Sequence, residues 1–286
     1  MKSKGMQLVK LWFLIIFISY LTSCSNTRII YTLAESFIQN EISFFINLKK
    51  DEKYLLSKQI SKMLNWHRTT MLPSYSLYLT DISDMLSANR YNYSDINKVF
   101  INGRSLIEDT ITGLTPFASQ FIIRHQTFEN IEFMEKKMTM RRKELLAELS
   151  QSKDILYNQR LEKLITNFER FFDNLNDKQL VFLKKYARIT LDDSKIRLFN
   201  RTQRQKVFID FLKKQPSEKE LTIYLNKLLL KGHIIINPNY KSFSEISIDR
   251  FSTLLVNMLM SSSKSQREKI ISKLREYAAD FDEVAG

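Results

Sequence analysis

Residues 152–174 read SKDILYNQRLEKLITNFERFFDN, and this stretch indicates the fold of the whole chain. Its apolar side chains recur every three or four residues, which is the spacing of one face of an α-helix. No glycine or proline interrupts it, and the full chain of 286 residues has only five Gly and four Pro. Long runs without these residues, rich in Leu, Lys, Glu and Gln, favour helix. We therefore predict an all-α fold, a multi-helix bundle of antiparallel amphipathic helices with one long central helix.

Capping residues and breaks in the apolar pattern predict where the other helices begin and end. The longest should run from Pro116 to about Ser150, because Gly113 ends the helix before it and Thr115-Pro116 is a favourable helix start. Thr69 to Pro73 should break an earlier helix, and residues 233–240 (HIIINPNY) should form an extended loop. The remaining helices are expected over 26–48, 51–68, 74–86, 94–111, 152–174, a short one after Asn176, 195–214, 217–231, 244–260 and 263–282.

The N-terminal residues have the pattern of a secretory signal. Lys2, Lys4 and Lys10 give a positive flank, and an apolar run follows from Leu11 to Tyr20. A run of roughly 10 to 12 apolar residues is too short to cross a hydrocarbon core as a permanent helix. A positive flank, a short apolar core and small residues before a cleavage site are typical of a signal peptide. We predict a signal peptide over residues 1–23.

The sequence at the predicted cleavage site is Leu21-Thr-Ser-Cys24, and Cys24 is the only cysteine of the chain. This tetrapeptide resembles the lipobox of bacterial lipoproteins. The resemblance implies that the signal is removed before Cys24 and that Cys24 carries covalent acyl chains such as palmitate. Two or more chains make membrane attachment stable. Ser25, by resemblance to the sorting rule of enteric bacteria, favours the outer membrane over the inner one. The alternative is an ordinary buried cysteine in a first helix.

These features predict one all-α periplasmic domain over residues 24–286, with a soft division near residue 150 and no low-complexity linker. Removal of the three lysines of the leader lowers the formal net charge from +13 to +10. In the periplasm this basic balance does not indicate nucleic acid. The lysines and arginines either solvate helix faces or bind anionic lipid headgroups. The stretch with the largest excess of cations runs from Lys195 to Lys214. It contains a single acid, Asp210, against Arg197, Arg201, Arg204, Lys206 and Lys213. The predicted partners are the membrane, through the lipid, and envelope proteins or anionic headgroups.

Two short segments echo each other. In each, a small polar residue precedes a glutamine by three positions, at Asn176 with Gln179 and at Ser263 with Gln266. Thr115 with Gln120 is a looser third instance. The pattern resembles the LTxxQ motif of Spy/CpxP-type periplasmic chaperones, which are all-helical proteins that cradle clients. The alternative is an ordinary capping box at the start of a helix.

A second resemblance rests on the segment that contains Gln59, Trp66-His67-Arg68 and Leu72-Pro73-Ser-Tyr75. It continues through Leu114-Thr115-Pro116 and ends in the C-terminal segment with Gln266, Tyr277 and Phe281. The whole is similar to a family of bacterial lipoproteins of unknown function that share a Q…WHR…LP.Y signature. The resemblance implies an envelope location and an all-α fold, and it implies no activity.

The candidate site residues are therefore Cys24 for lipid attachment and Trp66, His67, Arg68 and Pro73 for a binding or structural motif. The histidines His67, His125 and His233 show no paired ligand spacing, so we predict no metal and no cofactor apart from the lipid. No nucleophile or nucleotide-binding motif occurs either. We expect Trp66 in a core, His67 hydrogen-bonded and Arg68 paired with a carboxylate. Three functions stay open: a structural or interaction lipoprotein, a chaperone-like helical cradle, and an enzyme that uses His67 as an acid or base.

Overall fold

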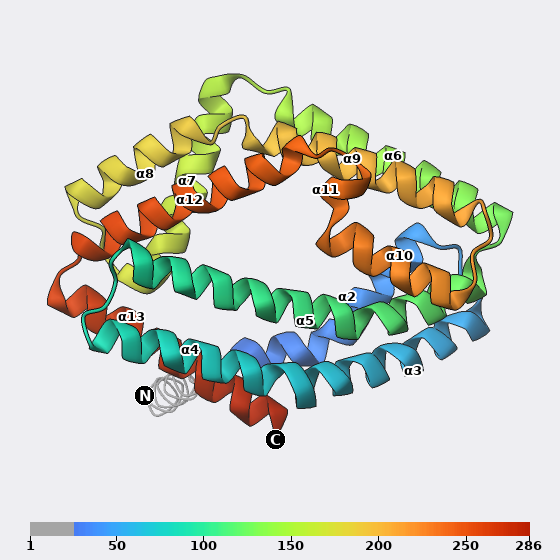
Figure 1. The fold of residues 1–286 in the computed structure, drawn as a ribbon, viewed down its shortest axis with the longest axis horizontal. Coiled ribbons are helices and arrows are strands. Elements are labelled where there is room, and N and C mark those ends of the chain that lie inside the picture. The colour runs from blue at the N-terminus through green and yellow to red at the C-terminus, as the bar shows by residue number, and fades with distance from the viewer. Residues whose placement is uncertain (1–25) are drawn as a thin grey trace, which may run out of the picture.

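The structure is a computed structural model and describes residues 26–286 (Figure 1). Helices joined by short loops make up this part of the chain, and no strand occurs in it, so the predicted all-α helical bundle is confirmed. The helices are α2 (Asn26–Phe45), α3 (Lys50–Trp66), the π-helix η1 (His67–Met71), α4 (Leu72–Ser87), α5 (Tyr93–His125), α6 (Phe128–Leu149), α7 (Lys153–Phe172), α8 (Asp177–Ile189), α9 (Asp193–Leu212), α10 (Glu218–Leu230), α11 (Gly232–Ile235), α12 (Asn239–Met260) and α13 (Lys264–Ala285).

Side-chain caps fix several of the helix starts. Ser217 accepts a hydrogen bond from the backbone N–H of Glu220, whose carboxylate accepts from the N–H of Ser217 in return. Asn176 and Gln179 make the same reciprocal pair at the start of α8. Each pair satisfies backbone donors that the first helical turn leaves free. The start of α5 differs from the prediction, because Asn92 rather than Ser94 is its cap.

The expected break at Thr69 to Pro73 is wrong, because α3, η1 and α4 form one continuous rod. Pro73 lacks a backbone N–H, and its ring disfavours an ordinary α-helical turn in front of it. The chain accommodates it with a π-helical turn, in which the N–H of Leu72 donates to the carbonyl of His67, five residues earlier. Pro73 then lies in the first turn of α4, where a missing donor costs little.

The long helix also lies elsewhere than predicted. α5 has 33 residues and runs through both Gly113 and Pro116, and the break comes afterwards at Gln126 and Thr127. Around Pro116 the hydroxyl of Thr115 donates to the carbonyl of Ile111 at 2.6 Å, within the continuing helix. Gly113 is therefore not a helix terminator in this fold. A smaller difference concerns residues 233–240, where the expected extended loop begins with the short helix α11.

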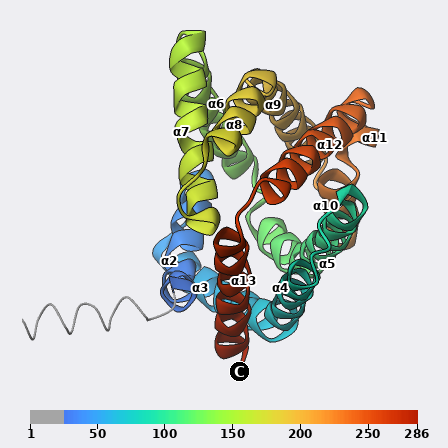
Figure 2. The same cartoon turned by 90° about the vertical axis from the view of Figure 1, so that its left-hand side faces the viewer.

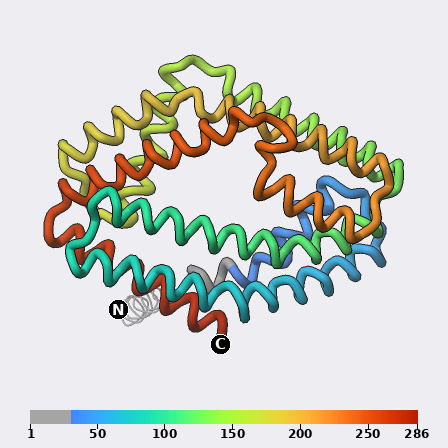
Figure 3. Tube along the Cα trace, viewed as in Figure 1, coloured from blue at the N-terminus to red at the C-terminus, as the bar shows by residue number. Residues whose placement is uncertain are grey.

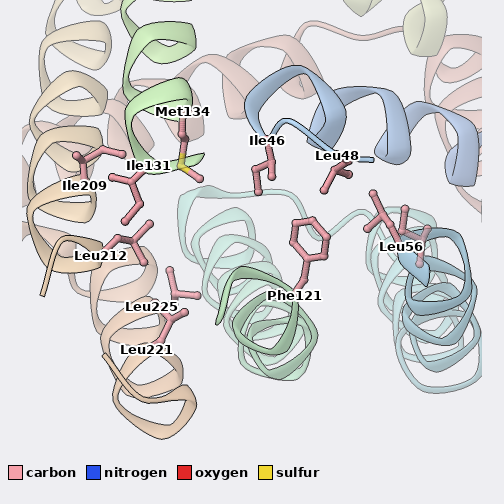
Figure 4. Packing of buried hydrophobic residues seen from close by; sticks show 11 residues of the cluster. Ile46, Leu48, Leu56, Phe121, Ile131, Met134, Ile209, Leu212, Leu221 and Leu225 are labelled. Atoms are coloured by element: carbon pink, nitrogen blue, oxygen red, sulfur yellow. The ribbon is translucent and has the colours of Figure 1, made fainter. Parts of the chain in front are cut away.

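Most of the buried hydrophobic residues form two clusters, one toward each end of the molecule. Figure 4 shows the first core cluster, to which α3, α5, α6, α9, α10 and the segment after α2 contribute. The second is built by α4, α5, α7, α8, α12 and α13. α5 supplies Phe121 to the first cluster and Ile96 to the second, so one helix joins both ends. The first core cluster is Ile46, Leu48, Leu56, Ile60, Phe121, Ile131, Met134, Ile209, Leu212, Leu221 and Leu225; the second is Met85, Leu86, Ile96, Phe168, Phe172, Leu183, Leu254, Met258, Leu259, Ile270 and Leu274.

The helices between the two clusters are spread apart. The tube in Figure 3 shows α12 diverging from α5, with α10 and α11 closing the wide end. Figure 2 shows α13 alongside α4, where the guanidinium of Arg275 donates to Asp84 at 3.1 Å. In this arrangement α4, α5, α10, α11 and α12 surround a central space, and residues from each of them line one cavity.

Candidate functional site

Trp66 ends α3 and packs against α5. A Cβ atom added at Gly113 would overlap the Cζ2 and Cη2 atoms of the Trp66 indole, so only glycine leaves room for the ring at this position of α5. The indole also lies beside Phe117, with ring centroids 6.1 Å apart. Most of the side chain is buried. Trp66 therefore fixes the α3–η1–α4 rod to α5. Gly113 does not end a helix as expected; it provides the space that the Trp66 ring occupies.

His67 begins the π-helix and is half-buried among aromatic rings. Its Nδ1 atom lies 2.6 Å from the hydroxyl of Tyr31 on α2. The Tyr31 ring stacks on the imidazole at 6.1 Å, and the Tyr75 ring meets it edge-on at 5.6 Å. The hydroxyl of Tyr75 in turn bonds to Thr110 on α5. His67 therefore joins α2, the rod and, through Tyr75, α5.

Both members of the His67–Tyr31 pair are held in their neutral forms. Burial lowers the pKa of His67 below its ordinary 6.5. Burial raises the pKa of Tyr31 to about 12, against the opposing effect of the Arg68 charge. Desolvation disfavours an imidazolium and a phenolate alike. At neutral pH the hydrogen bond therefore joins a neutral phenol and a neutral imidazole.

The other two residues of the motif point to solvent. Arg68 is exposed, and its Nη2 atom donates to Oδ1 of Asn65 at 3.1 Å, so the partner seen here is an amide rather than the expected carboxylate. Pro73 is exposed in the first turn of α4. The motif is thus divided, with Trp66 and His67 facing inward and Arg68 and Pro73 outward. Cys24 and the predicted signal peptide lie outside the described residues.

A cavity of about 690 Å³ is lined in part by Tyr75, whose ring also contacts His67, whereas His67 itself does not line it. Its walls come from α4, α5, α10, α11 and α12, with single residues from α9 and α13, and are mainly aromatic and aliphatic. Pockets of 300–1,000 Å³ with apolar walls and a few polar groups are typical of small-molecule sites. The lining residues are Tyr75, Tyr78, Leu79, Phe100, Gly103, Arg104, Leu106, Ile107, Arg204, Leu229, Leu230, Gly232, His233, Tyr240, Lys241, Ser244, Glu245, Ile248 and Phe281.

Sequence pattern alone does not reveal this cavity, because its walls come from helices far apart in the chain. Two of its lining residues lie in segments that stand out in the sequence. Tyr75 belongs to the signature segment, and Arg204 belongs to the stretch where cations outnumber acids.

The two echoed glutamine segments meet in space. The side-chain amides of Gln179 and Gln266 bond to each other reciprocally, at 3.1 and 3.0 Å, and both are buried. Asn176 also donates to the carbonyl of Ser261, across from its own helix. Both segments are capping boxes as well, so each glutamine caps a helix and joins the two helix starts. Thr115 differs, because it lies within α5 and its hydroxyl also bonds to Asn226.

The remaining histidines are dispersed. The Nδ1 atom of His125 lies 2.9 Å from the carbonyl of Phe121, and its Nε2 atom lies 3.8 Å from Glu52. His233 lines the cavity. Within residues 26–286 no three His, Cys, Asp or Glu side chains gather as metal ligands. Over the same range no helix is both long and apolar enough to pass through a bilayer.

The fold and site define an all-α protein with an aromatic motif at a π-helical turn and a cavity that shares Tyr75 with the surroundings of that motif. Residues 44–241, more than half of the chain, match the family model described as a family of unknown function, DUF6279. The chain belongs to this family. No curated protein and no solved structure matches the chain. The matched range includes the whole α3–η1–α4 rod and most of the cavity wall.

Proposed function

We propose that this chain is a lipid-anchored protein of the bacterial cell envelope that works as a binding or structural protein on the periplasmic side of the outer membrane. Support for the anchor comes from the leader and from Cys24 after Leu21-Thr-Ser. α2 begins only two residues after Cys24, so the helical body would lie close to the membrane. The observation that carries the binding role is the cavity of about 690 Å³ between the two core clusters.

The geometry of His67 favours a binding role over catalysis. Its Nδ1 atom is engaged by Tyr31, and its ring contacts Tyr75 but does not line the cavity. A general base must reach the proton that it removes. In this arrangement the His67 ring packs against Tyr75, and Tyr75 forms part of the wall.

The anchor is tested by Cys24→Ala. The variant should lose metabolic labelling with palmitate and should leave the membrane fraction or accumulate as an unprocessed form. A Cys24→Ala protein that still incorporates palmitate and sediments with outer membranes would contradict the lipid anchor.

The binding role is tested by filling the cavity. Ser244 lines it from α12, whereas Ser242, two residues earlier, is exposed and does not. In a strain whose own gene is deleted, Ser244→Trp should fail to complement, while Ser242→Trp should complement like the wild type. Thermal melts of both variants separate loss of function from loss of folding. Full complementation by a folded Ser244→Trp protein would show that the cavity is not used.

A chaperone-like cradle is the second proposal, and a separate observation favours it. A groove of about 470 Å³ with almost wholly apolar walls lies between α2, α3, α5 and α6. The exposed apolar surface next to it in the chain comes from Leu33 and Phe37 of α2, which do not line the groove and are 60% and 66% exposed. Exposed apolar surface of this kind can hold unfolded clients. Suppression of client aggregation by the wild type, reduced in Leu33→Glu/Phe37→Glu, would support this role over the first.

A further inference from the structure

One cation in the cavity wall lacks the partners that the other cations have. Arg104 pairs with Glu108 at 3.1 Å, and Lys241 pairs with Glu245 at 3.8 Å. The Nε atom of Arg204 is buried and has no hydrogen-bond partner among the described residues. Nε itself is covered by protein atoms, so a ligand in the cavity would reach the guanidinium through its other N–H groups. An arginine in an apolar cavity wall, with no ion pair among the described residues, points to a ligand that supplies a negative charge.

The backbone opposite Arg204 is shaped to admit the guanidinium. Gly232 is buried at the start of α11, and a Cβ added there would lie 3.1 Å from Nε and 3.3 Å from Cζ of Arg204. That spacing is tighter than ordinary van der Waals contact, so a Cβ at this position would require the guanidinium to shift by a few tenths of an ångström. Glycine at position 232 therefore lets the guanidinium lie directly against the backbone of α11.

The rest of the cavity wall determines the chemistry of the part of the ligand that does not contact Arg204. Phe100, Leu106, Leu229 and Ile248 present apolar surface to the cavity, and no carboxylate other than Glu245, already paired, lines it. Apolar surface of a ligand gains free energy by leaving water here. A small hydrophilic anion could pair with Arg204, but the apolar walls would stay in contact with water.

We propose that this cavity binds an amphipathic anion, with a carboxylate or phosphate on Arg204 and a saturated chain along the wall between α5 and α12. Arginine presents a planar fork of N–H donors that suits both anions. The inference deepens the proposed binding function by giving the class of ligand. A free fatty acid and a single-chain phospholipid share this chemistry, and the test distinguishes them.

The test uses photoreactive analogues of decanoate, decyl phosphate and decyltrimethylammonium, with the full-length protein in phosphatidylcholine nanodiscs. The anionic probes should crosslink to peptides of α5 and α12 that line the cavity, and mass spectrometry locates the crosslinks. Whichever of unlabelled decanoate and decyl phosphate competes at lower concentration identifies the headgroup. The cationic probe should not label these peptides, and inorganic phosphate alone should not compete.

The matched variants are Arg204→Met and Arg201→Met. Arg201 lies one turn earlier on α9, is exposed and does not line the cavity. Arg204→Met should weaken competition by unlabelled decanoate or decyl phosphate at least about tenfold, as the loss of a charged hydrogen bond predicts. Arg201→Met should leave it unchanged. Equal competition in both variants, labelling of the cavity by the cationic probe, or no labelling at all would overturn the proposal.

Failure of this proposal is distinguishable from failure of the proposed function. If Ser244→Trp loses complementation while no anionic probe labels the cavity, the cavity is used and its ligand belongs to another class. If the probes label the cavity and Ser244→Trp complements fully, the site binds amphipathic anions without serving the envelope role.

Discussion

The indole of Trp66 occupies the space over Gly113. The substitution Gly113→Ala should therefore destabilise the wild type but stabilise a protein that lacks Trp66. Alanine is better than glycine in a helix interior by about 0.8–1 kcal/mol. In the wild type, however, the new Cβ would overlap the indole of Trp66. Overpacking of this kind costs about 1–3 kcal/mol. Gly113→Ala should therefore destabilise the wild type, by up to about 2 kcal/mol once the helix gain is subtracted.

Removal of the indole reverses the expectation. Trp66→Ala alone should cost about 3–5 kcal/mol, because a ring of this size, mostly buried, removes roughly 150–200 Å² from water at about 25 cal/mol per Å². In a chain of this length each kcal/mol lowers Tm by about 2–4 °C. In the Trp66→Ala background the position over Gly113 is open. Gly113→Ala should then stabilise the protein by about 0.5–1 kcal/mol.

The measurement is a double-mutant cycle on Trp66 and Gly113, with urea and thermal unfolding followed by circular dichroism. Asn102→Ala is the control, because Asn102 is an exposed residue of the same helix. It should raise stability slightly and equally in both backgrounds. If Gly113→Ala has the same effect with and without Trp66, the indole does not occupy the space over Gly113 and the lock between the rod and α5 is refuted.

Other predictions concern the buried polar groups. Gln179→Leu or Gln266→Leu alone should destabilise by about 1–3 kcal/mol, because each leaves its partner amide buried without its bond. The double variant should cost less than the sum, and additive urea midpoints would argue against the reciprocal pair. Because the pKa of His67 is lowered in the folded protein, its contribution to stability is complete above pH 6.5 and is lost as the pH falls below that value. The Tm of His67→Phe should therefore fall less steeply than that of the wild type as the pH is lowered below 6.5. The raised pKa of Tyr31, about 12, makes its stabilisation complete below pH 10 and lost as the pH rises through 12. Absorbance titration of wild type and Tyr31→Phe should assign a phenol with that midpoint, and a midpoint near 10 would contradict its burial.

Local pattern is sufficient for the starts of α8, α10 and α13, although it misplaces the start of α5, which is also a capping box. Ser217 with Glu220 and Ser263 with Gln266 both begin helices where the sequence predicts them. Such caps depend on residues three positions apart, so no tertiary information is needed to find them.

Sequence pattern fails at glycine and proline, where tertiary packing decides the structure. Gly113 predicts a helix end, but its missing side chain makes room for the indole of Trp66, from a helix nearly fifty residues earlier. Pro116 lies inside α5, and Pro73 follows a π-helical turn rather than a break. Propensity is a weak guide where a neighbouring helix needs the space.

The candidate site was predictable in part. Trp66 and His67 were found by their place in a signature, and the structure gives each a named partner, Gly113 and Tyr31. The cavity could not be found in this way, since its wall depends on how α12 diverges from α5. The sequence of one helix predicts neither how two helices diverge nor that Arg204 lacks a partner for its Nε atom.

The π-helical turn makes the segment from Trp66 to Pro73 sensitive to its exact length. An α-helix advances about 100° per residue, so one extra residue in a turn rotates everything after it by that angle. Before the turn, Leu56 and Ile60 face the first core cluster; after it, Met85 and Leu86 face the second. Deletion of Thr70 would restore an ordinary helical phase and swing the apolar side of α4 away from α13. Relatives in the family should therefore vary the residues of this segment more freely than the number of residues in it.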